Sequence, residues 1–429
     1  MPGKILSGHL FEMTLYEELV ARGAVAQITD DALIDQLNQH SLTFYLGIDP
    51  TGDSLHVGHL FGLINCRRLQ LAGHKPVLLV GGATGMIGDP SGKSAERNLL
   101  DQAAIDANVA ALAKQIKSLI DAPLVNNYDW TSSYDVIAFL RDIGKHFSIN
   151  TMIAKESVKS RLDSGISFTE FSYQVLQALD YYHLYKDNNV TLQVGGTEQW
   201  GNITAGLDLI RRLLGPEAQA YGFCWDLITK SDGTKFGKTE QGAVWLDPNK
   251  TSPFAFYQFW LNTADDDAIR YLKKFTFVSL DDIDAIAAEM KTAPQHRAAQ
   301  KRLAQELTIM IHSHQAYDDA LRVSDALFRQ DYASLKVEEL IDGFQDVPRL
   351  ERSSIGILDA LVELKLASSK SEARRFVESG GVTLNNQKVE SIDVILDATT
   401  AIQGRFSILR RGKKQYGILL LPPAPSALS

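Results

Sequence analysis

Cysteine is almost absent from this chain of 429 residues, which has only Cys66 and Cys224. The two are far apart and lack the spacing of metal ligands, so we expect no disulfide framework, no structural zinc or other protein-held metal, and a cytoplasmic location. Long apolar runs are absent too, which excludes a transmembrane helix. Acidic residues at Glu12, Glu17 and Glu18 argue against a signal or transit peptide. At this length, we expect two to four domains.

Negative charge dominates the chain, but it is unevenly spread. The net charge is −9, a weak argument against nucleic-acid binding. From Arg349 onward, however, 12 Lys and Arg face 8 Asp and Glu, a net of +4, whereas the rest of the chain carries −13. A locally basic segment is where a phosphate backbone would bind, although scattered charge on a solvated surface explains it about equally well. We expect neither a membrane nor DNA as a partner.

Strand and helix patterns alternate in the first half of the chain. Thr43 to Ile48 and Pro76 to Val80 have strand composition, and Val57 to Ala72 between them has helical periodicity. The pattern returns with a strand at Val190 to Val194 and a helix at Gln199 to Leu214. This order predicts an α/β fold with a parallel sheet. Because ligands bind at the carboxyl ends of such strands, and polar or glycine-rich residues follow each one, we expect one shared pocket there.

The pattern changes twice further along the chain. We expect an α/β domain over residues 1–252 and a helical domain over 253–330. Residues 331–350 are less regular and are expected to be a linker, and 351–429 are expected to form a small basic α+β domain.

Two histidines stand at the predicted start of the first helix, in His56-Val57-Gly58-His59. Free backbone N–H groups and the helix dipole favour an anion there, and Gly58 lets a nucleotide come close. Histidines at helix starts are more often surface residues or caps. The preceding strand end at Asp49-Pro50-Thr51 favours phosphate binding.

A second candidate phosphate site is Lys235-Phe236-Gly237-Lys238-Thr239, which follows Ser231-Asp232-Gly233 and is therefore expected in a flexible loop. Two lysines around a glycine could close over a triphosphate and meet the charge that develops during transfer. Alone, the motif would indicate an exposed hairpin.

The glycine-rich stretch from Gly81 to Lys93 is not a P-loop, because the spacing would need glycine where Ile87 stands. We instead take Asp89 as a candidate partner for a substrate ammonium, although Asp89-Pro90 could also simply form a turn.

A polar stripe lies within the predicted helix around Phe171 to Tyr185. Tyr173, Gln177 and Asp180 are spaced i, i+4 and i+7, so they share one face. Such a stripe usually faces solvent, but no clean apolar face lies opposite, so a pocket wall is at least as well supported.

Taken together, these motifs resemble the bacterial tyrosyl-tRNA synthetases over nearly the whole chain. Tyr45 to His59 looks like the family's HIGH signature, and Lys235 to Thr239 looks like its KMSKS signature. The other matching segments are Gly81 to Lys93, Phe168 to Asp180, Gln193 to Asn202 and, for an S4 RNA-binding domain, Arg374 to Leu384. The resemblance implies a Rossmann-like catalytic domain, a helical domain and an S4-like domain. It also implies a homodimer, with Ile143 to Met152 and Phe168 as candidate interface.

The resemblance implies an activity as well: ATP, accompanied by Mg²⁺, activates L-tyrosine as tyrosyl-adenylate, and the tyrosyl group passes to tRNA(Tyr). Tyr45 and Asp180 would bind the phenol, and Asp89, Tyr173 and Gln177 the α-amino group. The remaining implied positions are Gln193, Glu198 and Gln199 along the carboxylate and ribose; Asp49 and Gly58 with ATP; Thr51, His56, His59, Lys235, Lys238 and Thr239 at the phosphates; and Lys93 and Arg97 toward pyrophosphate.

Two positions depart from the family pattern. Leu46 stands where cysteine is frequent and Glu198 where aspartate is common, and we expect both to change ATP affinity modestly. Three alternatives remain: a tryptophanyl-tRNA synthetase, a small-molecule adenylyltransferase, and a non-enzymatic S4-type RNA-binding protein. The Tyr45/Asp180 pair, the basic tail and the paired lysines respectively disfavour them.

Overall fold

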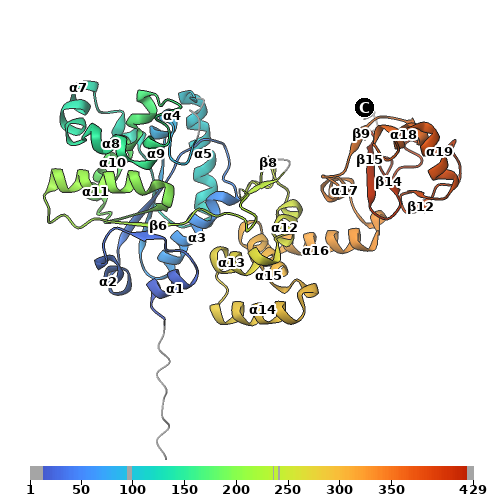
Figure 1. Ribbon diagram of the computed structural model, residues 1–429, viewed down its shortest axis with the longest axis horizontal. Coiled ribbons are helices and arrows are strands. Elements are labelled where there is room, and N and C mark those ends of the chain that lie inside the picture. Colours follow the sequence, from blue (N-terminus) through green and yellow to red (C-terminus); the bar gives the residue numbers. More distant parts are fainter. Residues whose placement is uncertain (1–12, 94–98, 235, 240–241, 423–429) are drawn as a thin grey trace, which may run out of the picture. The chain divides into compact units, whose positions relative to one another are not determined.

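The computed structural model describes residues 13–93, 99–234, 236–239 and 242–422 (Figure 1). The chain divides into two compact units. Unit 1 holds the residues up to Lys250 together with Trp260–Leu307, and unit 2 holds Thr251–Phe259 and the residues from Thr308 onward. Among the described residues, no helix is long and apolar enough to cross a membrane.

Unit 1 is built on a six-stranded sheet with the order β1-β6-β5-β2-β3-β4. All neighbouring strands are parallel except β1, which is antiparallel to β6. The strands are β1 (Gln27–Ile28), β2 (Thr43–Ile48), β3 (Lys75–Val80), β4 (Leu124–Asn126), β5 (Leu192–Gly196) and β6 (Tyr221–Trp225). The predicted parallel α/β sheet is therefore confirmed, and the apolar run in β3 is buried because helices cover the sheet.

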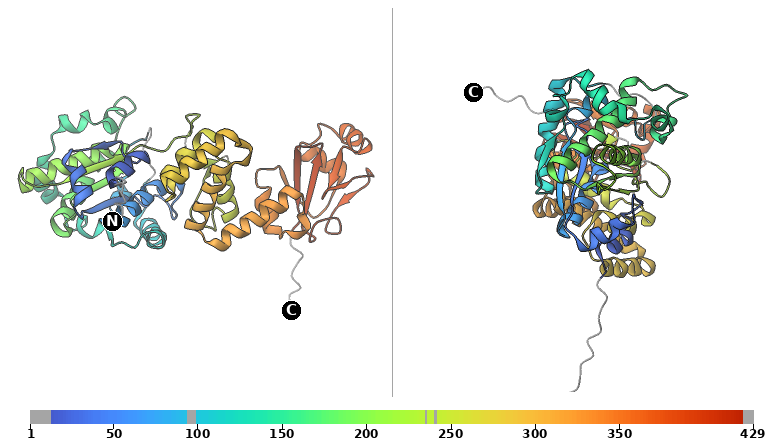
Figure 2. Two further views of the ribbon diagram at one scale, coloured as in Figure 1. Left: turned by 90° about the horizontal axis from the view of Figure 1, so that it is seen from below. Right: turned by 90° about the vertical axis from the view of Figure 1, so that its left-hand side faces the viewer.

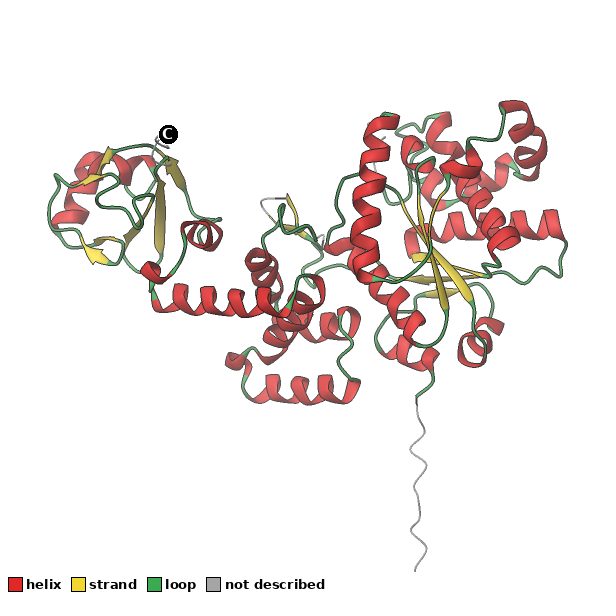
Figure 3. Cartoon of the chain, turned by 180° about the vertical axis from the view of Figure 1, so that it is seen from behind, coloured by secondary structure: helices red, strands yellow, loops and turns green. Residues whose placement is uncertain are grey.

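Two crossovers run in opposite directions from the middle of the sheet. Helix α3 (Val57–Leu71) connects β2 to β3, and helix α11 (Trp200–Leu214) connects β5 to β6. Because such crossovers are right-handed, these helices cover opposite faces of the sheet, with α10 (Phe168–Asn188) beside α11 (Figures 1 and 3). The order reverses between β2 and β5, which is where ligands bind in open α/β sheets.

The segment of unit 1 from Trp260 to Leu307 consists mainly of helices. They are α13 (Asp265–Phe275), α14 (Leu280–Thr292) and most of α15 (Ala298–Ile311). The region 253–330 is helical, as predicted, but its residues are shared between the two units. The predicted boundaries at 252, 330 and 350 stay a prediction, because packing into compact units does not show which segments fold independently.

Unit 2 contains an antiparallel sheet with one parallel edge, in the order β12-β11-β14-β15-β9. Helices α18 (Ile357–Glu363) and α19 (Lys370–Glu378) share a core with this sheet (Figure 2). The strands are β9 (Arg349–Glu351), β11 (Val382–Leu384), β12 (Gln387–Lys388), β14 (Phe406–Arg411) and β15 (Gln415–Leu420). The predicted small α+β fold is confirmed.

Residues 331–350 are not the irregular linker that was expected. They contain helix α17 (Val337–Gly343), and Tyr332, Leu335 and Leu340 pack in one core with Phe406 of the sheet. The prediction was wrong because the apolar residues of this segment lie in several short elements, so their spacing shows no single helical period.

Candidate functional site

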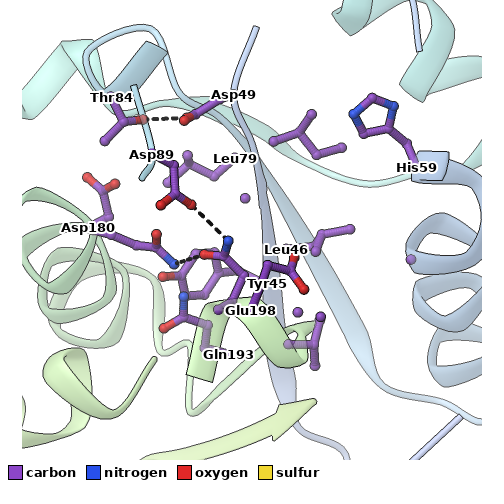
Figure 4. Close-up of a pocket in the computed structure, with 18 of the residues that line it drawn as sticks. Tyr45, Leu46, Asp49, His59, Leu79, Thr84, Asp89, Asp180, Gln193 and Glu198 are labelled. Carbon is purple, nitrogen blue, oxygen red and sulfur yellow. Dashed lines mark hydrogen bonds between the residues drawn. The ribbon is translucent and has the colours of Figure 1, made fainter. Parts of the chain in front are cut away.

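A cavity of about 240 Å³ lies at the carboxyl ends of β2 and β5, where the strand order reverses. Figure 4 shows Asp180 and His59 at opposite sides of it, with Tyr45, Gln193 and Glu198 between them. The predicted residues that line the cavity are Tyr45, Asp49, Thr51, Gly58, His59, Asp89, Tyr173, Gln177, Asp180, Gln193, Glu198 and Gln199. The predicted shared pocket is therefore present.

One end of the cavity holds a buried carboxylate beside a buried hydroxyl. Asp180, on α10, accepts a hydrogen bond on Oδ2 from Asn127 Nδ2 and one on Oδ1 from the indole Nε1 of Trp130, both 2.9 Å long. Burial raises the pKa of Asp180 to about 7, although these two hydrogen bonds lower it. The nearby hydroxyl of Tyr45, on β2, is buried and has no hydrogen-bond partner in the described part of the chain. Burial and the charge of Asp180 raise the pKa of this phenol well above its usual value.

A hydrogen-bonded network forms the adjacent wall. Gln199 Nε2 donates to Asp89 Oδ2 at 2.8 Å, Gln177 Nε2 donates to Gln199 Oε1 at 3.1 Å, and Asn202 Nδ2 donates to Gln177 Oε1 at 3.0 Å. The network fixes the orientation of the Gln177 and Gln199 amides, which both line the cavity. Asp89 also accepts the backbone N–H of Ser91 at 2.8 Å, so the predicted turn and the predicted pocket position are both observed.

Asp49 lies above this wall at the end of β2. The Tyr173 hydroxyl donates to its Oδ2 at 2.7 Å. The Thr84 hydroxyl donates to its Oδ1, also at 2.7 Å (Figure 4). Gly81 is required beside it, because a Cβ there would stand 2.2 Å from Asp49 Oδ1. The polar stripe of α10 therefore faces the pocket and not solvent, as its lack of an opposite apolar face had suggested.

The rings of the two histidines cap the start of helix α3 by accepting hydrogen bonds from backbone N–H groups. His56 Nδ1 accepts from the N–H of Gly58 at 3.0 Å, and His59 Nδ1 accepts from the N–H of His56 at 3.2 Å. Because each Nδ1 is an acceptor, each neutral ring carries its proton on Nε2. Burial and the neighbouring His56 lower the pKa of His59 to about 3. The two rings therefore cap the helix, and phosphate binding by this motif stays a prediction.

The lysine-containing motif, the second candidate phosphate site, packs its backbone against the first turn of α3. A Cβ on Gly237 would stand 2.9 Å from Val57 Cγ2, and Gly237 adopts a positive φ of 78°. The N–H of Val244 donates to the carbonyl of Gly237 at 3.1 Å, and the N–H of Val57 donates to the carbonyl of Val244 at 3.0 Å. A backbone hydrogen bond therefore joins Val57 and Val244, which are far apart in the sequence.

The described residues cover this motif only partly. Lys238–Thr239 form strand β7, which pairs with β8 (Gly242–Ala243), and only their backbone is described. Lys235 and Arg97 lie outside the described residues. His56 and Lys93 are described but are not among the residues that line the cavity.

The two departures from the expected pattern both reach the cavity wall. Leu46 is buried, and its Cδ2 lies 3.6 Å from the position of a Cβ on Gly62 of α3. Glu198 follows β5; burial raises its pKa, and its Oε2 is buried without a hydrogen-bond partner among the described residues.

Several residues that shape the site were not predicted. Thr84 lines the cavity, while Asn127 and Trp130 hold Asp180 from behind. Asn127 directly follows β4, so the rule that found polar residues after the other strands would also have found it. Nothing in the sequence marks Trp130 as a hydrogen-bond donor to Asp180.

Comparisons with known proteins agree with this geometry. Residues 37–329 match the model of the class I tRNA synthetases (W and Y), and residues 339–419 match that of the tyrosine–tRNA ligase SYY-like C-terminal domain. The chain is 50% identical to the tyrosine–tRNA ligase of Geobacillus stearothermophilus, over 95% of this chain and 99% of that protein. For the Listeria monocytogenes enzyme of the same name, the identity is 49%, over 94% and 99%.

Solved structures agree as well. A truncated mitochondrial tyrosyl-tRNA synthetase of Aspergillus nidulans superposes with a TM-score of 0.66 at 30% identity, covering 74% of this chain and 94% of that one. A tryptophanyl-tRNA synthetase of Encephalitozoon cuniculi, at 13% identity and a TM-score of 0.52 over 71% of this chain and 86% of that one, shares the fold. The chain therefore belongs to the tyrosine–tRNA ligase family of class I tRNA synthetases.

Proposed function

We propose that the chain is a tyrosine–tRNA ligase, and that the buried pair of Tyr45 and Asp180 selects the substrate. The observation that carries this proposal is the unpartnered Tyr45 hydroxyl beside a carboxylate whose other contacts are already made. A phenol entering here can donate to Asp180 and accept from Tyr45. A phenyl ring would leave both groups buried without a partner, which is the cost that lets an enzyme of this kind reject phenylalanine; the handling of that pair of substrates is itself a standard example of the principle.

The remaining groups would hold the amino acid and ATP in line. The carboxylate of Asp89 and the hydroxyl of Tyr173 suit an α-ammonium, with Gln177 fixed between them through the amide network. Gln193 and Glu198 have buried oxygens without partners in the described structure, and these suit the amino-acid backbone and the ribose hydroxyls. For the phosphates, we propose Thr51, the Nε2–H groups of His56 and His59, Lys235, Lys238 and Thr239, with Asp49, Gly58 and Gln199 along the nucleotide and Lys93 and Arg97 at pyrophosphate.

The chemistry requires no protein nucleophile. A carboxylate oxygen of tyrosine forms a bond to the α-phosphorus of ATP while the bond to the β-phosphate oxygen breaks, so pyrophosphate leaves. Mg²⁺ enters bound to ATP as part of that substrate. A ribose hydroxyl at the 3′ end of tRNA(Tyr) then attacks the tyrosyl carbonyl and releases AMP. The enzyme contributes position and N–H donors where negative charge develops.

Pyrophosphate exchange with single amino acids tests this function. We expect tyrosine to support ATP–pyrophosphate exchange far above phenylalanine or tryptophan. Equal exchange with tryptophan would favour the related activity that shares the fold, and no exchange with any amino acid would favour an RNA-binding protein without catalysis.

We assign the tRNA-binding role to unit 2. Arg410 and Arg411 end β14, and the exposed Lys413 and Lys414 follow in the turn before β15. Four basic residues within five positions form a surface suited to a phosphate backbone. We place the reaction in the cytoplasm, where reducing conditions suit the two buried free thiols.

We further propose a homodimer formed through unit 1. Phe168, at the start of α10, is 76% exposed. An aromatic residue on the surface of a monomeric protein is usually less exposed than this. In the expected interface segment Ile143 to Met152, both end residues are buried within unit 1, but Ile149 is exposed. We therefore propose that the interface includes the exposed apolar residues of this region. These are Val136, Ile137, Leu140, Ile149, Ile153 and Leu162. Sedimentation of a Phe168→Asp variant tests it, because a charge in an apolar interface should yield monomers, whereas an unchanged mass would place the contact elsewhere.

A further inference from the structure

Asp180 is held by two side chains that differ in how firmly they are fixed. Asn127 makes two further hydrogen bonds: its Oδ1 accepts from the N–H of Ala83 at 2.8 Å, and its Nδ2 also donates to Thr84 Oγ1 at 2.9 Å. Trp130 has only one N–H, and that group points at Asp180. The placement of this donor therefore depends on how the indole ring is packed.

The indole is only half-buried, and it belongs to the four-residue helix α6 (Tyr128–Thr131). One face of it lies on the imidazole of His183, with ring centroids 4.4 Å apart and planes inclined by 19°. His183 is in turn fixed by Asp187, whose Oδ2 lies 3.1 Å from its Nδ1. The imidazole of His183 is therefore held in place by a residue one turn further along helix α10.

Asp180, His183 and Asp187 occupy positions i, i+3 and i+7 of the 21-residue helix α10 and lie along one face of it. The same helix therefore carries the carboxylate and the aromatic platform that steadies a donor to that carboxylate. Trp130 connects the two, because its edge contacts Asp180 and its face contacts His183.

We propose that His183 is a positioning residue for substrate selection, which acts through Trp130 to keep a hydrogen bond on Asp180. His183 does not line the cavity and is one-third exposed, so it influences the choice of a phenol over a phenyl side chain from outside the pocket. This inference rests on the proposed function, since it assumes that Asp180 receives the substrate phenol.

Removal of the platform would loosen one donor. The Asp180 carboxylate would then be less well fixed, and the hydrogen bond that it offers to a phenol would weaken. A phenyl side chain makes no such bond, so binding of phenylalanine would not change. The signature of this role is a loss confined to tyrosine.

The test compares three single variants of the full-length chain in ATP–pyrophosphate exchange with tyrosine and with phenylalanine. His183→Ala removes the platform, His183→Phe keeps an aromatic face without the contact to Asp187, and Lys186→Ala is a matched control on an exposed residue of the same helix. For His183→Ala we expect the ratio of kcat/KM for tyrosine to that for phenylalanine to fall about 3- to 10-fold, the range for weakening a hydrogen bond to a charged group without removing it. The change should appear in KM for tyrosine, with KM for ATP unchanged.

His183→Phe should restore the ratio to within about 2-fold of the unmodified chain, since stacking is kept, and Lys186→Ala should leave it unaltered. An unchanged ratio in His183→Ala, or an equal loss for both amino acids, would overturn the proposal. Failure of the proposed function itself would look different, because the unmodified chain would then show no preference for tyrosine at all.

Discussion

The ionisation of Asp180 makes tyrosine binding depend on pH, and Asn127→Ala should move that dependence. Burial raises the pKa of this carboxyl to about 7, and the N–H of Asn127 is the larger of the two hydrogen-bond contributions that hold it down. The ionised carboxylate is the form that accepts a hydrogen bond from the phenol while it also accepts hydrogen bonds from Asn127 and Trp130. The affinity for tyrosine should therefore be high at pH values above 7, and it should decrease as the pH falls below 7.

The magnitude follows from the lost hydrogen bond. A hydrogen bond to a charged group contributes about 1.5–3 kcal/mol, and at 1.36 kcal/mol per unit its loss raises the pKa of Asp180 by about 1–2 units. At pH 7.5 the ionised fraction would then fall from about three-quarters to between about one-quarter and 3%, which weakens tyrosine binding about 3- to 25-fold. At pH 9.5 Asp180 is mostly ionised in both proteins, so the variant should bind within about 1.5-fold of the unmodified chain.

Equilibrium dialysis with labelled tyrosine between pH 6 and 9.5 measures this effect. The ratio of the two dissociation constants at each pH cancels the titration of tyrosine's own amino group. Asn126→Ala is the matched control, because Asn126 also accepts loop N–H groups, from Gly82 at 3.1 Å and Tyr128 at 3.0 Å, and no hydrogen bond joins it to Asp180. A loss in Asn127→Ala that is the same at every pH would refute the reasoning and indicate a general disturbance of the loop.

Four further variants test other parts of the protein. Tyr45→Phe should reduce the preference for tyrosine over phenylalanine about 10-fold in pyrophosphate exchange, since a buried hydrogen-bond partner is lost; an unchanged preference would remove Tyr45 from the phenol site. Lys238→Ala should lower kcat for adenylate formation far more than it weakens tyrosine binding, and equal losses would contradict a transition-state role. Leu46→Cys should change KM for ATP modestly, and no change would mean that this side chain does not affect the ribose. Lys413→Glu with Lys414→Glu should impair tRNA charging while pyrophosphate exchange is spared; charging at the normal rate would exclude this turn from tRNA binding.

The charge reversal in the turn is a sharper test of unit 2 than deletion of residues from Glu351 onward. Tyr332 and Leu335 share a core with Phe406, Ile408 and Ile418. A truncation at 351 would remove Phe406, Ile408 and Ile418 from that core and expose the rest to water, so a loss of charging could reflect unfolding. The two lysines are exposed and can be changed without that disturbance.

Much of unit 1 was predictable because its signals are local. The strand Thr43–Ile48 was predicted with its bounds, and α3 and β3 to within a residue, since apolar runs between turn residues define them. The shared pocket followed from the rule that parallel strands end at the same edge, and the polar stripe of α10 from helical spacing. The places of Tyr45 and Gln193 came only from the family resemblance.

What could not be predicted depends on packing between distant elements. Trp130 reaches Asp180 only because β4 lies at the sheet edge next to β3, an order that periodicity does not give. In the same way, no local signal shows that Gly237 packs on Val57. The segment 331–350 was misjudged because its short helix is stabilised by contacts with Phe406 and its neighbours, and short helices have little intrinsic signal.

The two ends of the cavity are coupled through charge. Asp49, Asp89, Asp180 and Glu198 all face one cavity; the charge of Asp49 raises the pKa of Asp180, and that of Asp89 raises the pKa of Glu198. An ammonium group bound beside Asp49 and Asp89 would offset this repulsion and favour the ionised form of Asp180, which is the form that accepts a phenol. Binding of the ammonium group should therefore strengthen binding of the phenol, and the reverse. A ligand that has the phenol but no ammonium group should lose more affinity than its missing ammonium contacts account for. Selectivity in such a pocket belongs to the whole amino acid, even though only two side chains contact the hydroxyl that distinguishes it.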